Sequence, residues 1–373
     1  MSVNPTQIET TLIGTGGGYG ESIVVNIGNN EWIIVDSCIN PITYTPLPLE
    51  YLKSLDVNIK TDVKLIICTH WHDDHIRGIS KVLEECESAK FSLSKTTDRT
   101  KFLQFVGKDY SKIKSEATVA STKEIKTCFD IVENRGVQVV GAIQDRLLYS
   151  NKKLNGIDSL VISLSPSDYV INEFDREIST LITEFGGSEK KVIYNSPNDK
   201  SVVILIKIND QRILLGSDLE VSENPQKGWR CIIQESIVFN EKSHIFKIPH
   251  HGSITAYEKS IWDSLIDNNA IAKLSPWKNG DKKLPKKEMI DAFLSHTSEL
   301  YITSIPSKAK GHAKKRDKSI EKAIRQKNST LKEVKFYEGI VRCSLDLSSK
   351  SPAWNVELFG GAKKVDTNTF TLD

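Results

Sequence analysis

The chain has 373 residues, of which 39% are hydrophobic, and a formal net charge of +2. Such a composition is typical of a globular protein with one large or two small domains. It excludes protein classes with an extreme composition, such as collagen-like or intrinsically disordered chains. The sequence has neither an uncharged apolar run of 18 residues nor a secretory leader, so we expect a cytoplasmic protein without a membrane segment. Six scattered cysteines, with no Cys-x-x-Cys pair, predict buried thiols.

The N-terminal part predicts a β-meander. Strands are expected over 9–13, 22–27 and 31–35, with a glycine-rich turn over 14–20 between the first two. This order differs from the strand-helix-strand order of a dinucleotide-binding fold. We therefore interpret the glycines as turns that let the backbone pass close to a site, and the third strand ends at Asp36.

The middle of the chain predicts alternating helices and strands. A short helix over 49–55 and a buried strand over 63–68 precede a histidine cluster, and a helix follows over 79–86. Residues 92–155 are mostly charged with a helical pattern, which we interpret as an insertion. Further elements are expected as a helix over 174–182 and strands over 160–164, 202–206, 212–215, 245–248 and 300–303. Two strand-dense halves predict a sandwich of sheets with helices outside.

The segment from Thr69 to His75 carries three imidazoles and two carboxylates directly after an apolar strand. Burying such groups is costly unless they are satisfied, and divalent metals bind imidazole nitrogen and carboxylate oxygen together. We expect His70 and His72 to bind one metal, and Asp74 and His75 to bind a second.

Two later segments can complete a binuclear centre. Asp218 follows one predicted strand, and His250 and His251 follow another. Alone, the aspartate would be interpreted as a turn residue and the histidines as a surface or core pair. Together with the first cluster they predict a bridging carboxylate, Asp218, and a distal ligand, His251, although the sequence leaves open which histidine of the pair binds metal.

These motifs resemble the metallo-β-lactamase superfamily, whose signature is His-x-His-x-Asp-His. Within it, residues 8–304 resemble the ComEC-like hydrolase and nuclease group, on segments such as Asn198 to Val203 and Pro249 to Ser253. The resemblance implies an α+β fold, an αββα four-layer sandwich, with Asp36 orienting a metal ligand and Asp218 as the bridging aspartate.

The sequence departs from the wider superfamily at one position. Most of its hydrolases carry a further metal-binding histidine, whereas this chain has no histidine between His75 and His244. The first metal would then have His70, His72 and Asp218 as protein ligands. We expect Asn198 or Ser201 to lie near the coordination position that the missing histidine leaves open. This absence counts against thioesterase, lactonase and β-lactamase activities.

These residues predict a metal-dependent hydrolase that uses a hydroxide activated by two divalent metals, with zinc expected and manganese as the alternative. We expect a phosphodiesterase or nuclease, with Asp74, His250 and Asp36 in catalysis. One alternative is hydrolysis of a small phosphate ester or cyclic nucleotide. Another is a hydrolase subunit of a larger assembly, such as a defence system.

The region from Lys308 to Lys335 is basic, with 11 Lys or Arg against three acidic residues. Such a run is often a solvated helix face or a flexible tail, but it can also neutralise nucleic-acid phosphates. The residues expected to contact substrate are Asn198, Ser201, Ser253, Lys314, Lys315 and Arg316.

The remaining expectations concern organisation and partners. We expect a hydrolase domain over 1–330 that contains the insertion at 92–155, and a C-terminal β cap over 331–373 with paired strands at 342–347 and 354–359. Nucleic acid is the expected substrate, no membrane is involved, and a partner protein or homo-oligomer is allowed.

Overall fold

A computed structural model describes residues 4–15, 20–95, 116–154, 156–184, 197–279, 282–305 and 338–366. These described residues form two large sheets and one small hairpin. In spatial order the first sheet contains β17 (Asn355–Gly360), β16 (Gly339–Asp346), β1 (Gln7–Gly14), β2 (Glu21–Asn26), β3 (Trp32–Val35), β4 (Val63–Cys68), β5 (Lys90–Ser94) and β6 (Val140–Ala142).

The second sheet pairs strands from the later part of the chain. In spatial order it contains β18 (Lys363–Lys364), β15 (Leu300–Ile302), β12 (Ile266–Leu274), β11 (Ser243–Lys247), β10 (Gln211–Leu215), β9 (Ile204–Ile208), β8 (Ile157–Ser163) and β7 (Arg146–Leu154). The small hairpin consists of β13 (Trp277–Asn279) and β14 (Lys282–Leu284).

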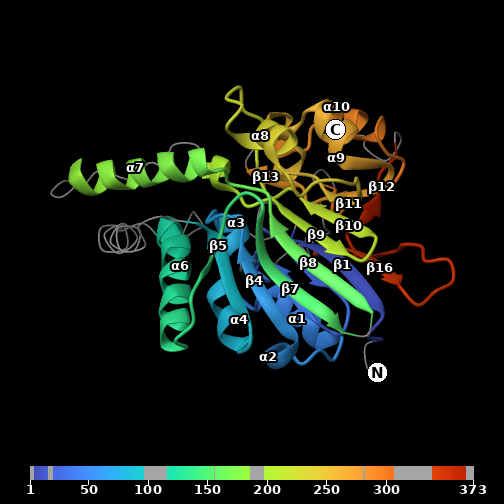
Figure 1. The fold of residues 1–373 in the computed structure, drawn as a ribbon, viewed down its shortest axis with the longest axis horizontal. Helices are drawn as coiled ribbons and strands as arrows, with labels where there is room; N and C mark the ends of the chain where they lie inside the picture. Colours follow the sequence, from blue (N-terminus) through green and yellow to red (C-terminus); the bar gives the residue numbers. More distant parts are fainter. Residues whose placement is uncertain are drawn as a thin grey trace, which may run out of the picture.

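Helices cover the outer faces of the two sheets (Figure 1). On the side of the first sheet lie α1 (Leu47–Ser54), α2 (Ile59–Asp62), α3 (Asp73–Ile76), α4 (Ile79–Glu85) and α6 (Glu116–Asn134). On the side of the second sheet lie α8 (Gly228–Glu235), α9 (Lys259–Leu265) and α10 (Lys287–Leu294), whereas α7 (Asp168–Glu184) extends away from the sandwich. None of the described helices combines the length and apolar character needed to cross a membrane.

Three hydrophobic cores separate four layers. One core lies between the two sheets, and one lies between each sheet and its helices. On β4, Leu65 and Ile67 face the other sheet, while Ile66 and Cys68 face the helices. A strand covered on both faces favours apolar residues on both, which explains the apolar run from Leu65 to Cys68. The layers confirm the predicted sandwich of two sheets with helices outside.

Each sheet has a parallel half that directs its loops to the functional edge. In the first sheet β3, β4, β5 and β6 are parallel, and in the second β10, β11, β12 and β15 are parallel. Side chains that follow the carboxyl ends of parallel strands collect at one edge. Asp36 and His70 follow strands of the first sheet, and Asp218 and His251 follow strands of the second.

The predicted insertion over 92–155 and the C-terminal region also contribute strands to the two sheets. The described part of 92–155 contains α6, but it also supplies β6 and β7, which lie at the edges of the two sheets. In the C-terminal region β16 and β17 pair antiparallel, as the sequence predicts, and β16 also pairs with β1. All six cysteines are buried and free, which confirms the interpretation of the scattered thiols.

Gly339, at the start of β16, contacts the backbone of the other sheet closely. A Cβ at this position would lie 1.7 Å from the carbonyl oxygen of Thr303. We expect Gly339→Ala to lower the free energy of unfolding by about 1–3 kcal/mol, because backbone must shift to relieve the overlap. Gly361→Ala is the control, since its Cβ would meet the same oxygen at an ordinary 3.4 Å. Equal urea denaturation midpoints for both variants would contradict this account.

Candidate metal centre

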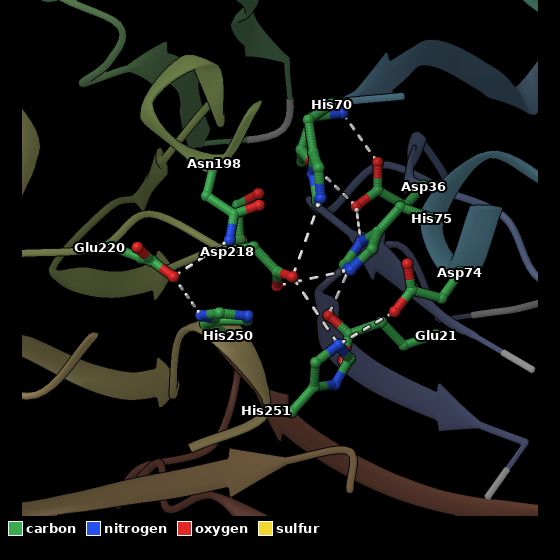
Figure 2. Close-up of polar contacts among 12 residues, drawn as sticks. Glu21, Asp36, His70, Asp74, His75, Asn198, Asp218, Glu220, His250 and His251 are labelled. Carbon is green, nitrogen blue, oxygen red and sulfur yellow. Dashed lines mark hydrogen bonds and ion pairs between the residues drawn. The ribbon is translucent and has the colours of Figure 1, made fainter. Parts of the chain in front are cut away.

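Six side chains predicted as metal ligands converge at the functional edge in two groups. Figure 2 labels all of them except His72. The first group comprises His70, His72 and Asp218, whose ligand-type atoms all lie within 4.8 Å of one another. A second group with the same closeness comprises the side chains Asp74, His75 and His251. Each group offers imidazole nitrogen together with carboxylate oxygen, the donors that suit zinc and manganese.

Asp218 belongs to the first group and also contacts the second. Its carboxylate oxygens are 3.8 Å from His70 Nε2 in the first group, and 3.4 Å from His75 Nε2 and 3.7 Å from His251 Nε2 in the second. The side chain is almost fully buried. A single carboxylate in contact with imidazoles of both groups has the position required of a bridging ligand.

The hydrogen bonds of Thr69 orient His70. The Thr69 hydroxyl donates to Asp36 Oδ2 at 2.7 Å and therefore accepts from His70 Nδ1, 3.0 Å away. The proton of His70 is thus on Nδ1, and the lone pair of Nε2 faces the centre. Asp36 also accepts the N–H of Thr69 at 2.7 Å, so one carboxylate holds the whole turn.

The other two buried imidazoles are oriented in the same way. His75 Nδ1 donates to Asp36 Oδ2 at 2.7 Å, and His251 Nδ1 donates to the carbonyl oxygen of Ser275 at 3.0 Å. Carboxylate and carbonyl oxygens only accept hydrogen bonds from these nitrogens. The Nε2 atom of each ring therefore faces the centre, an arrangement typical of metal-binding histidines.

The donor atoms at the centre fit a bound cation. His70 Nε2, His75 Nε2 and Asp218 Oδ1 are buried and have no hydrogen-bond partner among the described residues. Nitrogen lone pairs that face a buried carboxylate repel it unless a positive charge lies between them. Although burial lowers the pKa of His75, the carboxylates of Asp218 and Asp36 raise it well above its usual value. The centre thus attracts positive charge, which divalent metals would supply.

A buried ion pair that the sequence analysis did not identify lies beside the centre. Lys247, the last residue of β11, is fully buried and contacts the Glu21 carboxylate, and its Nζ lies 4.0 Å from Asp218 Oδ1. Although burial lowers the pKa of Lys247, these carboxylates raise it above its usual value. The lysine therefore stays charged and offsets part of the negative charge at the centre. Its position inside the otherwise apolar run from Ile245 to Ile248 was the available sequence signal.

The glycine-rich turn approaches the centre at Gly20, which confirms the close approach predicted for this segment. Gly20 has a φ of +116°, and a Cβ there would lie 2.3 Å from the carbonyl oxygen of Asp74. Only glycine combines this backbone conformation with that contact. Residues 16–19 of the turn lie outside the described residues.

His250 and Asn198 share a carboxylate partner that the sequence analysis also missed. The Glu220 carboxylate accepts from His250 Nδ1 at 2.8 Å and from Asn198 Nδ2 at 3.1 Å. His250 lies at the edge of the centre and is partly exposed, whereas His251 points inward (Figure 2). The structure therefore places His251, rather than His250, among the ligand-type groups.

The remaining predicted substrate residues have different positions. Ser201 is fully buried, and its hydroxyl has no partner among the described residues. Ser253 accepts the N–H of Thr255 at 3.3 Å and caps the short turn that follows the histidine pair. Lys314, Lys315 and Arg316 lie outside the described residues.

Comparisons with known proteins found one family model and several solved structures that are similar to parts of the chain. The family model described as the metallo-β-lactamase superfamily matches residues 15–101, which include the Thr69 to His75 segment. No curated protein matches the chain. Among solved structures, the hydrolase AbOPH of the β-lactamase superfamily is 21% identical, with a TM-score of 0.25 over 38% of this chain and 51% of its own. The match thus spans about half the length of that protein.

Two further solved structures match larger parts of the chain. A metallo-β-lactamase from Hirschia baltica is 11% identical, with a TM-score of 0.27 over 57% of this chain and 72% of its own. A metallo-β-lactamase from Pontibacter korlensis is 14% identical, with a TM-score of 0.26 over 60% of this chain and 73% of its own. Residues 15–101 are thus similar to the metallo-β-lactamase superfamily, and the four layers formed by the described residues are consistent with that similarity.

Proposed function

We propose that the protein is a metal-dependent phosphodiesterase of the ComEC-like group that cleaves DNA or RNA. The observation that carries the proposal is that Asp218, a member of the first ligand group, also contacts His75 of the second. This arrangement supports two neighbouring cations, and two-metal sites are common in enzymes that cleave phosphodiesters.

Two bound divalent metals would lower the pKa of a water and neutralise charge on phosphate oxygens. That chemistry depends on correctly oriented ligands, and other groups of this protein orient the imidazole rings. Asp36 and Thr69 hold His70 and His75 with Nε2 inward, and the carbonyl of Ser275 does the same for His251. Phosphoryl transfer depends mainly on positioning and electrostatics, which a rigid, buried set of ligands provides.

His250 is proposed to contact the scissile phosphate or the leaving group. Its Nδ1 is held by Glu220 at 2.8 Å, so its orientation is set by a partner outside the two ligand groups. It follows Pro249 and directly precedes His251, which brings it to the edge of the centre. A half-exposed imidazole at this edge is accessible to a bound polymer, whereas the buried ligands are not.

A polyanionic substrate is supported by the distribution of charge along the sequence. The region from Lys308 to Lys335 holds 11 of the 50 lysine and arginine residues and follows the last parallel strand, β15. Contacts between such residues and phosphates release counterions, so binding weakens steeply as salt rises. Salt dependence therefore separates a nucleic-acid substrate from a small ester.

The test is hydrolysis of labelled single- and double-stranded DNA and RNA, and of bis-p-nitrophenyl phosphate, with zinc or manganese. We expect the wild type to cleave a polymer and Asp74→Ala to lose this activity. We also expect the KM for the polymer to rise by on the order of tenfold or more between about 50 mM and about 200 mM salt.

The other outcomes separate the competing functions. Turnover of the small ester alone, insensitive to salt, would replace the nuclease with a small-molecule phosphodiesterase. Absence of turnover in protein that binds metal tightly would favour a hydrolase subunit that requires a partner. Polymer cleavage that persists in Asp74→Ala would show that the activity does not belong to this centre.

A further inference from the structure

Glu220 collects three hydrogen bonds at a single carboxylate oxygen beside the metal centre. Its Oε1 accepts from His250 Nδ1 at 2.8 Å, from Thr255 Oγ1 at 3.0 Å and from Asn198 Nδ2 at 3.1 Å. An ionised carboxylate only accepts hydrogen bonds, so each of these groups must turn a donor toward it. Glu220 therefore determines which end of the Asn198 carboxamide faces the carboxylate.

The other end of that carboxamide is a buried oxygen without a partner. Because the NH2 group of Asn198 faces Glu220, its Oδ1 points away, and this atom is buried with no hydrogen-bond partner among the described residues. Leaving such an acceptor unsatisfied costs about 1–3 kcal/mol, so native structures rarely do so without a ligand. The fixed orientation and the absence of a partner among the described residues indicate that Asn198 Oδ1 is available to a ligand.

The loop that carries Asn198 runs beside the first ligand group. Asn198 belongs to the 3-10 turn η1 (Pro197–Lys200), and the N–H of Val202, just after this turn, donates to the carbonyl oxygen of Thr69 at 3.1 Å. This bond ties the loop to the residue that precedes His70. Figure 2 shows the Asn198 side chain on the side of the centre occupied by His70 and Asp218.

We propose that Asn198 Oδ1 is a fourth protein ligand of the divalent metal at His70, His72 and Asp218, with Glu220 as its positioning residue. Three groups from the protein leave coordination positions open, and amide carbonyl oxygen is a ligand that suits manganese in particular. An ion with five or six ligands can bind this oxygen and still keep a position for water. The proposal rests on the same metal centre as the proposed function, but it assigns Asn198 to the metal instead of to the substrate.

The assignment is tested by measuring the metal affinity of the first ligand group in protein whose second group is disabled. In an Asp74→Ala background the second group is incomplete, so calorimetric titration of metal-free protein with zinc or manganese reports mainly on the first. We expect Asn198→Ala to weaken this affinity by about tenfold or more, the range seen when groups around a metal are removed. Asn198→Leu, which preserves the volume, is expected to do the same.

Two further variants separate coordination from general disruption. Glu220→Gln is expected to weaken affinity in the same direction, because its own amide NH2 can turn the Asn198 oxygen away from the metal. Asn269→Ala is the matched control, since Asn269 lies exposed on β12, outside the centre. Its affinity is expected to stay within about twofold of the parent, and circular dichroism checks that every variant is folded.

The cobalt(II) form of the otherwise wild-type protein provides a second readout that does not depend on the Asp74→Ala background. Replacing the amide oxygen by water in Asn198→Ala is expected to change the visible absorption bands. Unchanged bands and unchanged affinity would overturn the proposal. So would a rise in KM without any loss of metal affinity, which would make Asn198 a substrate contact.

The failures of the two proposals are distinguishable. If metal affinity depends on Asn198 but the protein cleaves no phosphodiester, the ligand assignment stands and the proposed substrate is rejected. If the protein cleaves phosphodiesters but its metal affinity does not depend on Asn198, the proposed function stands and the ligand assignment is rejected.

Discussion

Asparagine in place of Asp218 is expected to lower hydrolytic turnover by about 10³-fold and to weaken the binding of both metals. The carboxylate contacts imidazoles of both ligand groups, at 3.8 Å from His70 Nε2 and 3.4 Å from His75 Nε2. An amide of the same shape lacks the negative charge that holds two cations close together, and loss of one preorganised electrostatic group costs on the order of 10²–10³ in rate. Turnover and metal content per chain are the measurements.

Asp73→Asn is the matched control for this prediction. Asp73 lies in the same cluster of charged residues, but its carboxylate is half-exposed and contacts Arg77 at 3.4 Å instead of the imidazoles. We expect its metal content and turnover to remain within about twofold of the wild type, since an exposed ion pair contributes at most about 1 kcal/mol. If both variants lost activity equally, the loss could not be assigned to the bridging position.

Methionine in place of Lys247 is expected to lower the free energy of unfolding by about 3–5 kcal/mol, because it leaves the buried Glu21 carboxylate without its cation. Both side chains are almost fully buried, so water cannot replace the lost partner. The measurement is urea denaturation of the metal-free protein, in which no bound metal obscures the loss. The double variant Glu21→Gln with Lys247→Met removes both charges and is expected to recover more than half of the loss.

Lys273→Met provides a matched comparison from the neighbouring strand. Lys273 is the register partner of Lys247 and is equally buried, but its Nζ donates to the carbonyl oxygen of Thr10 at 2.7 Å. Burial lowers its pKa, so the protein gains little by keeping this amine charged. We expect Lys273→Met to be the milder substitution, and an equal or larger loss than in Lys247→Met would contradict the role assigned to the ion pair.

The ligand groups were predictable from the sequence because their signals are local. Three histidines and two aspartates within six residues have few structural explanations, and Asp218 and His251 each follow a largely apolar strand. Strands that end at one edge of a sheet bring distant residues together without any further information. The choice between His250 and His251, however, depends on backbone conformation, since both have positive φ values and their rings face different partners.

The residues that support the centre were not predictable, because their roles depend on contacts across the sandwich. Glu21 lies on the first sheet and Lys247 on the second, and neither belongs to a recognisable motif by itself. Glu220 follows Asp218 in sequence, but its contact with Asn198 requires the η1 loop to be in place. Similarly, β16 joins β1 from the opposite end of the chain, a pairing that no local pattern specifies.

The sequence by itself determined most of the apolar strands, such as β1 to β4 and β9 to β11, and the ligand-type residues, because apolar runs and histidine spacing act over short distances along the chain. It did not predict β5, β6, β7 or β12. The tertiary structure alone decided which groups face one another: it brought Asp218 into contact with both ligand groups and turned the Nε2 atoms of His70, His75 and His251 inward. It also left Asn198 Oδ1 without a partner among the described residues. These relations depend on the packing of two sheets against each other. Packing depends on surfaces formed by residues that are far apart in sequence. The geometry of the metal centre therefore follows from the packing and not from any local sequence pattern.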